Sequence, residues 1–186
     1  MKNIFTIGGK LALICAVAAI VLGFVNSFTE PAIEQNRKQE LADALKTVVT
    51  EGKIGEEQVA ADVPEIVGYY PVTSSNDKTI GFALKLLGSG YGGDMNILTY
   101  YSTEGEVLSV VLMENGETPG LGKMAEKKEY MEKFIGTGAL TPLPVRKDQL
   151  PQAEADAITG ATVTFMGIAK ALEAGSLFVS ALGEEK

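Results

Sequence analysis

The residues from Leu11 to Phe28 form an uncharged, apolar run, which constrains the fold more than any other stretch. Lys10 precedes this run, and the next charged residue is Glu30. As a helix, the run would extend about 27 Å, close to the thickness of a hydrocarbon core. Val25-Asn26-Ser27 also has the small-residue spacing of a signal-peptide cleavage site. The length of the run favours a retained membrane helix over residues 11–29.

The charge distribution excludes one class of partner. The chain has 186 residues and a net charge of −8. Only Lys2 and Lys10 are charged before residue 30, so the remainder holds 14 bases and all 24 acids, a net charge of −10. Nucleic-acid binding needs clustered Lys and Arg, so we expect no nucleic-acid partner. With no His and only Cys15, which lies in the apolar run, we also expect no disulfide and no metal site.

The rest of the chain predicts an α+β fold. Pro31 suits the first turn of a second helix, which the apolar stripe carries to about residue 50. Two predicted hairpins follow, one pairing 66–73 with 79–87 and the other pairing 96–102 with 106–113. A helix at 124–135, a Pro-containing loop at 136–151 and a last helix from residue 165, interrupted at Gly175, complete the chain. Grouped strands followed by helices indicate an antiparallel sheet with packed helices. The predicted parts are 1–10, the span 11–29, a helical connector 30–64 and a domain 65–186.

The stretch from Asp156 to Thr164 combines three threonines with Gly160 and Ala161, just before the last helix. A helix amino terminus has unpaired N–H groups and a positive dipole end, so it favours a phosphate. Gly160 would let a ligand approach the main chain. A plain helix cap is the simpler interpretation. The pattern does not distinguish Thr159, Thr162 and Thr164 as a possible attachment point.

A second motif, Glu117-Thr118-Pro119-Gly120-Leu121-Gly122, follows the last predicted strand. Pro119 and Gly120 fit the central positions of a type II turn, and the glycines leave main-chain N–H groups open to a ligand. A tight turn with no further role is the alternative. Between the hairpins lies a glycine cluster at residues 88–93, in which Tyr91 could cover a planar ligand. Without a phosphate-loop context, this cluster is more simply a flexible connection.

Together the two motifs resemble the FMN-binding domain of respiratory membrane complexes. Within that family, the chain is most similar to RnfG, the G subunit of Rnf electron transport complexes. The sister of RnfG is NqrC, which belongs to the sodium-pumping NADH:quinone reductase (Nqr). The resemblance covers the apolar run, the Thr29-Glu30-Pro31-Ala32-Ile33 step, the glycine cluster and both motifs. Asn115 and Phe165 depart from the residues that many relatives have at these positions.

The resemblance implies covalent FMN, linked by a phosphoester to Thr162. Asp156, Thr159, Gly160 and Ala161 would form the recognition motif for a flavin transferase that uses FAD as donor and Mg²⁺. The residues from Glu117 to Gly122 would lie against the flavin. The implied chain is a single-pass protein of the inner cell membrane, with a cytoplasmic amino terminus and an extracytoplasmic domain.

The implied function is electron transfer within an Rnf-type ion-translocating ferredoxin:NAD⁺ oxidoreductase, without independent catalytic activity. The expected partners are the other Rnf membrane subunits, the transferase and the lipid bilayer. NqrC is the first alternative, although the short segment after the anchor favours the Rnf assignment. A non-redox, anchored extracellular binding domain is the second alternative.

Overall fold

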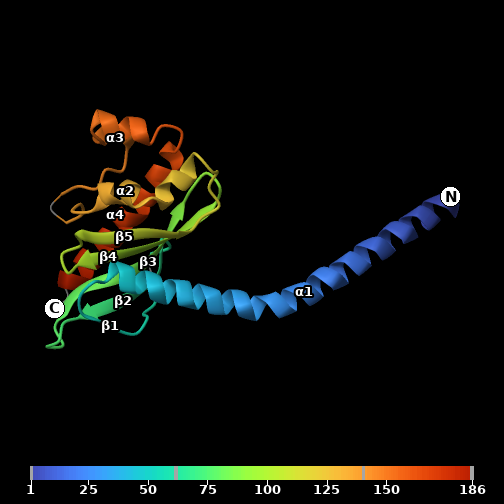
Figure 1. The fold of residues 1–186 in the computed structure, drawn as a ribbon, viewed down its shortest axis with the longest axis horizontal. Coiled ribbons are helices and arrows are strands. Elements are labelled where there is room, and N and C mark those ends of the chain that lie inside the picture. The colour runs from blue at the N-terminus through green and yellow to red at the C-terminus, as the bar shows by residue number, and fades with distance from the viewer. Residues whose placement is uncertain (1, 61–62, 140, 185–186) are drawn as a thin grey trace. The chain divides into compact units, whose positions relative to one another are not determined.

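A computed structural model describes residues 2–60, 63–139 and 141–184 of the chain (Figure 1). Its contacts divide the chain into two compact units, Met1–Ala42 and Asp43–Lys186. The expected connector, 30–64, is helical only as far as Val48, and residues 43–64 fall within the second unit.

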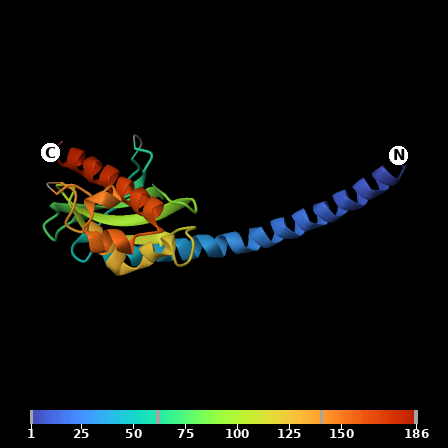
Figure 2. The same ribbon diagram turned by 90° about the horizontal axis from the view of Figure 1, so that it is seen from above.

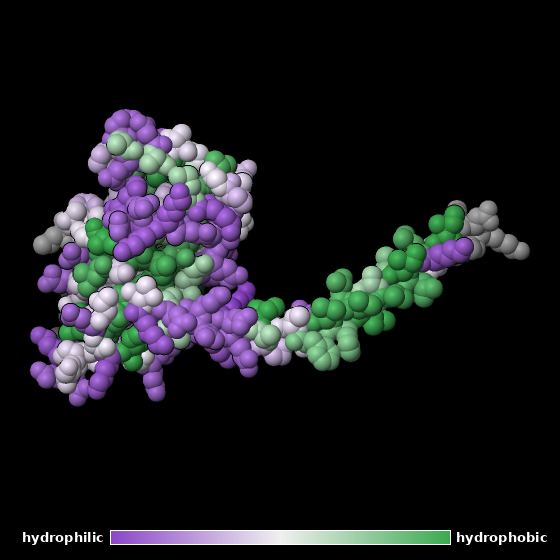
Figure 3. Space-filling model, viewed as in Figure 1, coloured by the Kyte–Doolittle hydropathy of each residue, from purple (hydrophilic) through white to green (hydrophobic). Residues whose placement is uncertain are grey.

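The first helix, α1 (Lys2–Val48), is continuous. The prediction of a new helix beginning at Pro31 is therefore wrong: Pro31 lies inside α1. A proline within a helix removes only one backbone hydrogen bond, and flanking turns can keep the helix intact. Apolar side chains cover the amino-terminal part of α1 (Figure 3). In the most apolar 18-residue segment of this helix, the buried share is 0%. By length and composition, this part can span a membrane. Among the described helices, α4 (Thr162–Glu184) is also long and apolar enough to span a membrane, but 44% of its most apolar 18-residue segment is buried.

The second unit contains a five-stranded antiparallel sheet in the order β1-β2-β3-β4-β5. The strands are β1 (Lys53–Ile54), β2 (Ile66–Thr73), β3 (Thr79–Ser89), β4 (Asp94–Ser102) and β5 (Val107–Glu114). The enrichment in β-branched and aromatic residues placed the four long strands to within about two residues, and the antiparallel sheet with packed helices confirms the predicted α+β class. Strand β1 was not expected, because two residues are too few to give a periodic pattern.

Helix α4 packs along one face of the sheet (Figure 2). Phe165, Ile168 and Leu172 of α4 are fully buried in one cluster with alternate strand residues such as Leu84 and Ile97. Their strand neighbours, including Ala83 and Leu98, are also buried but lie outside that cluster. Because successive side chains of a strand point to opposite faces, the sheet is buried on both sides. Leu45, Val48 and Val49, at the end of α1 and just after it, are buried as well.

The predicted interruption at Gly175 does not occur, because α4 runs without a break from Thr162 to Glu184. Gly175 instead provides room for Tyr101 of β4: a Cβ atom at Gly175 would lie 2.5 Å from Tyr101 Oη. The Tyr101 hydroxyl donates a hydrogen bond to the Leu172 carbonyl at 2.9 Å. The glycine is therefore a packing position rather than a helix end.

The helix predicted over 124–135 is broken into three short pieces: η1 (Gly122–Glu126), α2 (Lys128–Met131) and η2 (Glu132–Phe134). Lys127 between the first two has extended backbone angles. The segment after this break buries Tyr130 and Phe134, and the Phe134 ring stacks on Phe165 at 5.2 Å. Tertiary packing therefore overrides the helical periodicity here. Two further short helices follow, η3 (Lys147–Gln149) and α3 (Gln152–Ala157).

We predict that Gly175→Ala destabilises the protein by about 1–2 kcal/mol, because overpacking against the fixed Tyr101 ring outweighs the gain in helix propensity. Glu173→Ala, at an exposed position of the same helix, is the matched control and should change stability by less than about 0.5 kcal/mol. Urea unfolding of the full chain in detergent micelles measures both. A Gly175→Ala protein as stable as the wild type would contradict the packing role of this glycine.

Candidate functional site

The two sequence motifs meet in one pocket of ≈ 390 Å³. A volume of this size falls within the usual range for small-molecule sites, about 300–1,000 Å³. Its lining combines the turn that follows β5, the start of α4 and the tyrosine of the glycine cluster. The lining residues are Tyr91, Glu117, Thr118, Leu121, Gly122, Gly160, Ala161, Thr162, Val163 and Thr164. Of the residues singled out from the sequence, Pro119, Gly120, Asp156 and Thr159 do not line it.

The turn on one side of the pocket has the geometry expected for Pro119-Gly120. The Leu121 N–H donates to the Thr118 carbonyl at 3.1 Å, which closes a four-residue turn. Gly120 has a φ of +82°, as the third position of a type II turn requires. The turn places Thr118 and Leu121 against the pocket, and Leu121 keeps 47% of its surface exposed.

The other side of the pocket is the amino terminus of α4, which begins at Thr162. The first helical hydrogen bond runs from the Phe165 N–H to the Ala161 carbonyl at 2.9 Å. The N–H groups of the preceding three residues therefore have no partner within the helix, and the positive dipole end lies at the pocket. Gly160 has a φ of +90°, so this backbone bend suits glycine. This end of the pocket is suited to a phosphate group.

The three threonines of the motif have different surroundings. Thr164 is 1% exposed, and its hydroxyl donates to Glu117 Oε2 at 3.1 Å. Thr159 is exposed; its hydroxyl donates to the Ala155 carbonyl and accepts a hydrogen bond from Lys147 Nζ at 2.8 Å. Thr162 is half-buried and lines the pocket. Within the described residues, its hydroxyl has no hydrogen-bond partner.

Glu117 connects the parts of the pocket. Its carboxyl group is only 4% exposed. One oxygen accepts the Gly92 N–H at 3.2 Å, and the other accepts the Thr164 hydroxyl. The Glu117 N–H in turn donates to Asn115 Oδ1 at 3.1 Å. One side chain thereby joins the glycine cluster, the turn and α4.

The glycine cluster packs against this carboxyl group rather than forming a free loop. A Cβ atom at Gly90 or at Gly122 would overlap a carboxyl oxygen of Glu117. A Cβ at Gly92 would overlap the Gly116 carbonyl. Tyr91 is 81% exposed at the pocket, so its ring is available to a ligand. The flexible-connection interpretation of this cluster is therefore wrong at Gly90 and Gly92, where close packing requires glycine.

The remaining motif residues lie beside the pocket. Asp156 belongs to α3, is exposed and accepts a hydrogen bond from Gln152 Nε2 at 2.9 Å. The Lys147 ammonium group, from η3, donates a hydrogen bond to the hydroxyl of Thr159, which lies three residues before Thr162. Sequence reasoning missed Lys147, because nothing in the loop 136–151 connects it with the threonine motif. It also missed the Thr164–Glu117 bond, which joins residues far apart in the chain.

Tyr130 lies next to this network. Burial, and then the charge of Glu117, raise the pKa of its hydroxyl. The hydroxyl oxygen is buried and has no hydrogen-bond partner among the described residues. Its ring packs edge-on against Phe165 at 6.4 Å between centroids.

Comparison with known proteins decides the family. A model of the FMN-binding domain matches residues 90–175, and a model of the RnfG N-terminal region matches residues 1–48. The chain is 30% identical over 177 residues to the G subunit of the Na⁺-translocating ferredoxin:NAD⁺ oxidoreductase complex of Acetobacterium woodii, covering 88% of this chain and 85% of that protein. This chain belongs to the RnfG family.

A second curated relative is also an Rnf-type G subunit. The G subunit of the proton-translocating ferredoxin:NAD⁺ oxidoreductase complex of Clostridium ljungdahlii is 28% identical over 173 residues, with 92% of this chain and 89% of the relative covered. The crystal structure of NqrC from Shewanella oneidensis overlaps 70% of each chain at 17% identity and a TM-score of 0.48. The match to the FMN-binding domain model spans both pocket motifs and identifies an FMN-binding flavoprotein. The apolar helix α1 and the membrane-complex relatives identify a membrane-anchored protein.

We predict that Glu117→Ala destabilises the protein by about 1–3 kcal/mol, because the Gly92 N–H and the Thr164 hydroxyl lose their acceptor. Glu117→Gln should cost less, since an amide retains one acceptor oxygen. Glu129→Ala, at an exposed position, is the control and should be nearly neutral. Denaturant unfolding of the three variants checks the order. Equal stabilities for Glu117→Ala and Glu129→Ala would contradict the bridging role.

We predict that Tyr130→Phe is neutral or stabilising by up to about 1 kcal/mol at pH 7, because it removes a buried hydroxyl without a partner. The pKa of Tyr130 is raised in the folded protein, so the folded state holds this proton more tightly than the unfolded state does. The resulting contribution to the free energy of unfolding is complete below the unfolded pKa of about 10 and is lost as the pH rises above it. As the pH rises above 10, the stability of Tyr130→Phe should therefore fall less than the stability of the wild type. Unfolding at pH 7 and above pH 10 tests this, and a clear loss at pH 7 would show that the hydroxyl has a partner.

Proposed function

We propose that this chain carries electrons through FMN attached by a phosphoester to Thr162, as a membrane-anchored subunit of an Rnf-type ion-translocating complex. The observation that carries the proposal is the position of Thr162. Of the three candidate threonines, it alone lines the pocket with a hydroxyl that has no partner in the described part of the chain. Attachment at Thr164 would break its bond to Glu117 and require access to a side chain that is 1% exposed.

The residues present fit a flavin phosphate at this end of the pocket. The N–H groups at the start of α4 can stabilise the negative charge of a phosphodiester. Gly160 lines the pocket without a side chain, so a ligand can approach its main chain closely. Lys147, which contacts Thr159, supplies a nearby positive charge. These groups would hold the phosphate without any change of fold.

The apolar lining suits the rest of an FMN molecule. Tyr91, Leu121 and Val163 line the pocket and keep 81%, 47% and 53% of their surfaces exposed. Large exposed apolar side chains gathered around a pocket favour a ligand that covers them, and an aromatic ring such as that of Tyr91 can stack on a planar one. FMN supplies the redox chemistry when it is bound. The chain supplies the position of the cofactor and the electrostatic environment, and we propose no independent catalytic activity.

The proposed partners follow from the relatives, which are subunits of ferredoxin:NAD⁺ oxidoreductase complexes. The other subunits of such a complex would exchange electrons with this one. A flavin transferase would attach the cofactor from FAD with Mg²⁺, so that the Thr162 hydroxyl loses its proton and AMP leaves. Asp156 and Thr159 would serve recognition by that enzyme, since both are exposed beside the pocket. We propose a single α1 span, with residues 65–186 on the extracytoplasmic side.

Intact mass spectrometry tests the proposal. The full chain, co-expressed with a flavin transferase, should gain the mass of FMN minus one water and should keep flavin fluorescence after denaturation. Thr162→Ala should gain nothing, because it removes the only proposed attachment oxygen. Thr141→Ala, at an exposed site outside the pocket, is the control and should be modified like the wild type.

Two outcomes would contradict the proposal in different ways. Modification of Thr162→Ala would move the attachment to another residue and reject the assignment of Thr162. An unmodified wild type beside an active transferase would reject covalent flavin, and the domain would then be a non-covalent flavin site or a plain binding module.

A further inference from the structure

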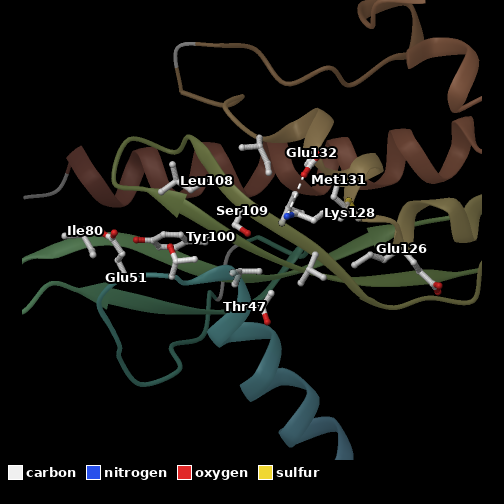
Figure 4. Close-up of a pocket in the computed structure, with 16 residues that line it drawn as sticks. Thr47, Glu51, Ile80, Tyr100, Leu108, Ser109, Glu126, Lys128, Met131 and Glu132 are labelled. Carbon is white, nitrogen blue, oxygen red and sulfur yellow. Dashed lines mark ion pairs between the residues drawn. The ribbon is translucent and has the colours of Figure 1, made fainter. Parts of the chain in front are cut away.

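A second cavity, of ≈ 850 Å³ and so larger than the motif pocket, lies between the end of α1 and the α2–η2 segment (Figure 4). All of its lining residues belong to the second unit. Its floor includes five consecutive residues of β5, Leu108–Leu112. Side chains alternate along a strand, so a groove that contacts five residues in a row reaches the strand's edge. Ile80 and Tyr100 also line it, so the groove extends over the adjoining face of the sheet as well.

Strand β5 is the last strand of the sheet and pairs only with β4. At its start, Val107 is covered: its N–H donates to the Thr137 carbonyl at 2.8 Å, and its carbonyl accepts the Gly136 N–H at 2.9 Å. From Leu108 to Leu112, the outward-facing backbone groups form no hydrogen bond with any described residue. An open row of N–H and C=O groups is a template for another strand.

The sequence of this edge lacks the features that usually prevent pairing. Edge strands are normally protected by charged residues, prolines or bulges. Residues 107–113 read Val-Leu-Ser-Val-Val-Leu-Met, with no charge and no proline. The β4–β5 register has two irregularities, between Asn96 and Ile97 and between Tyr100 and Tyr101, so bulges lie near both ends of the open part. Between them, residues 109–112 pair in register with residues 97–100 and carry no charge.

The groove beside the edge would accept alternate side chains of an added strand. Leu108 and Ile135 line it and keep 39% and 43% of their surfaces exposed. An open edge combined with an apolar trough is the arrangement by which proteins bind an extended peptide through strand addition. A small molecule could fill the groove, but it would leave the backbone N–H and C=O groups of the β5 edge unpaired.

The charges around the groove select the occupant. Glu51, Glu126 and Glu132 line it; Lys128 pairs with Glu132 at 3.9 Å (Figure 4), and Lys123 pairs with Glu126 at 3.3 Å. Glu51 has no ion pair with any described residue, so it leaves the groove with a net negative charge. A second copy of this chain would bring the same carboxyl groups together, and the chain already carries a net charge of −8. Charge complementarity therefore favours a strand flanked by Lys or Arg.

We propose that this groove binds an extended, apolar segment of another protein, flanked by basic residues, as a sixth strand beside β5. The site is separate from the flavin pocket, because the two cavities share no lining residue. The proposal therefore does not depend on the flavin or on Thr162. It assigns a protein-binding role to the edge of the same sheet that carries the cofactor site.

The test uses the full chain in lipid nanodiscs and a fluorescein-labelled peptide, Lys-Lys-Val-Thr-Val-Thr-Val-Lys-Lys, followed by fluorescence anisotropy. We expect saturable binding that slows amide hydrogen exchange within residues 108–112. Val111→Lys should weaken binding at least about tenfold, because it places a charge in the groove beside the edge. Val67→Lys, at an exposed position of β2 outside the groove, is the matched control and should bind as the wild type does.

A second probe does not depend on the folding of any variant. The same peptide with alternate backbone nitrogens methylated keeps its side chains and charges but loses the donors for strand pairing. It should bind the wild type at least about tenfold more weakly. A peptide with Glu in place of Lys should also bind more weakly, and Glu51→Lys should reduce that difference.

Three results would overturn the proposal. The first is the absence of saturable binding at millimolar peptide. The second is equal binding of the methylated and unmethylated peptides, which would mean apolar adhesion without strand addition. The third is a concentration-dependent dimer of the chain itself that Val111→Lys abolishes, which would make a second copy the occupant.

Discussion

The pocket depends on the hydrogen bonds of one buried carboxyl group. Glu117 accepts a backbone N–H from the glycine cluster and a side-chain hydroxyl from α4, while its own backbone belongs to the turn that follows β5. These three segments lie far apart in the chain, and one side chain joins all of them. Buried polar networks of this kind specify one arrangement, because every unsatisfied member carries a desolvation cost. Glycine at 90 and 122 follows directly, since any side chain there would displace the carboxyl group.

The sheet places two different surfaces on one small domain. Helix α4 covers one face, and its amino terminus, at Thr162, opens into the motif pocket. The edge strand β5 borders the second groove and then leads directly into the turn of the pocket. A protein strand added to β5 would therefore lie only a few residues from Glu117. For a protein whose proposed work is to exchange electrons with partners, the proposed partner contact would then lie close in the chain to the motif pocket.

The sequence predicted the regular parts of this fold and the two motifs, because both depend on local patterns. β-Branched and aromatic residues mark the long strands, and Pro119-Gly120 requires a turn whatever surrounds it. Features set by tertiary contacts were not predictable. Gly175 looks like a helix break until Tyr101 is found against it. Lys147 carries no pattern that links it to Thr159. The sequence pattern did not distinguish the three threonines; the family resemblance pointed to Thr162, and the surroundings of the three residues support that proposal.

The central claim is that the motif pocket holds FMN on Thr162, and an experimental structure of the flavin-loaded full chain tests it most directly. We expect continuous density from Thr162 Oγ1 through a phosphate at the start of α4, with the flavin ring against Tyr91 and Leu121. Flavin density joined to another residue, or lying in the groove beside β5 while the Thr162 hydroxyl remains bare, would contradict it.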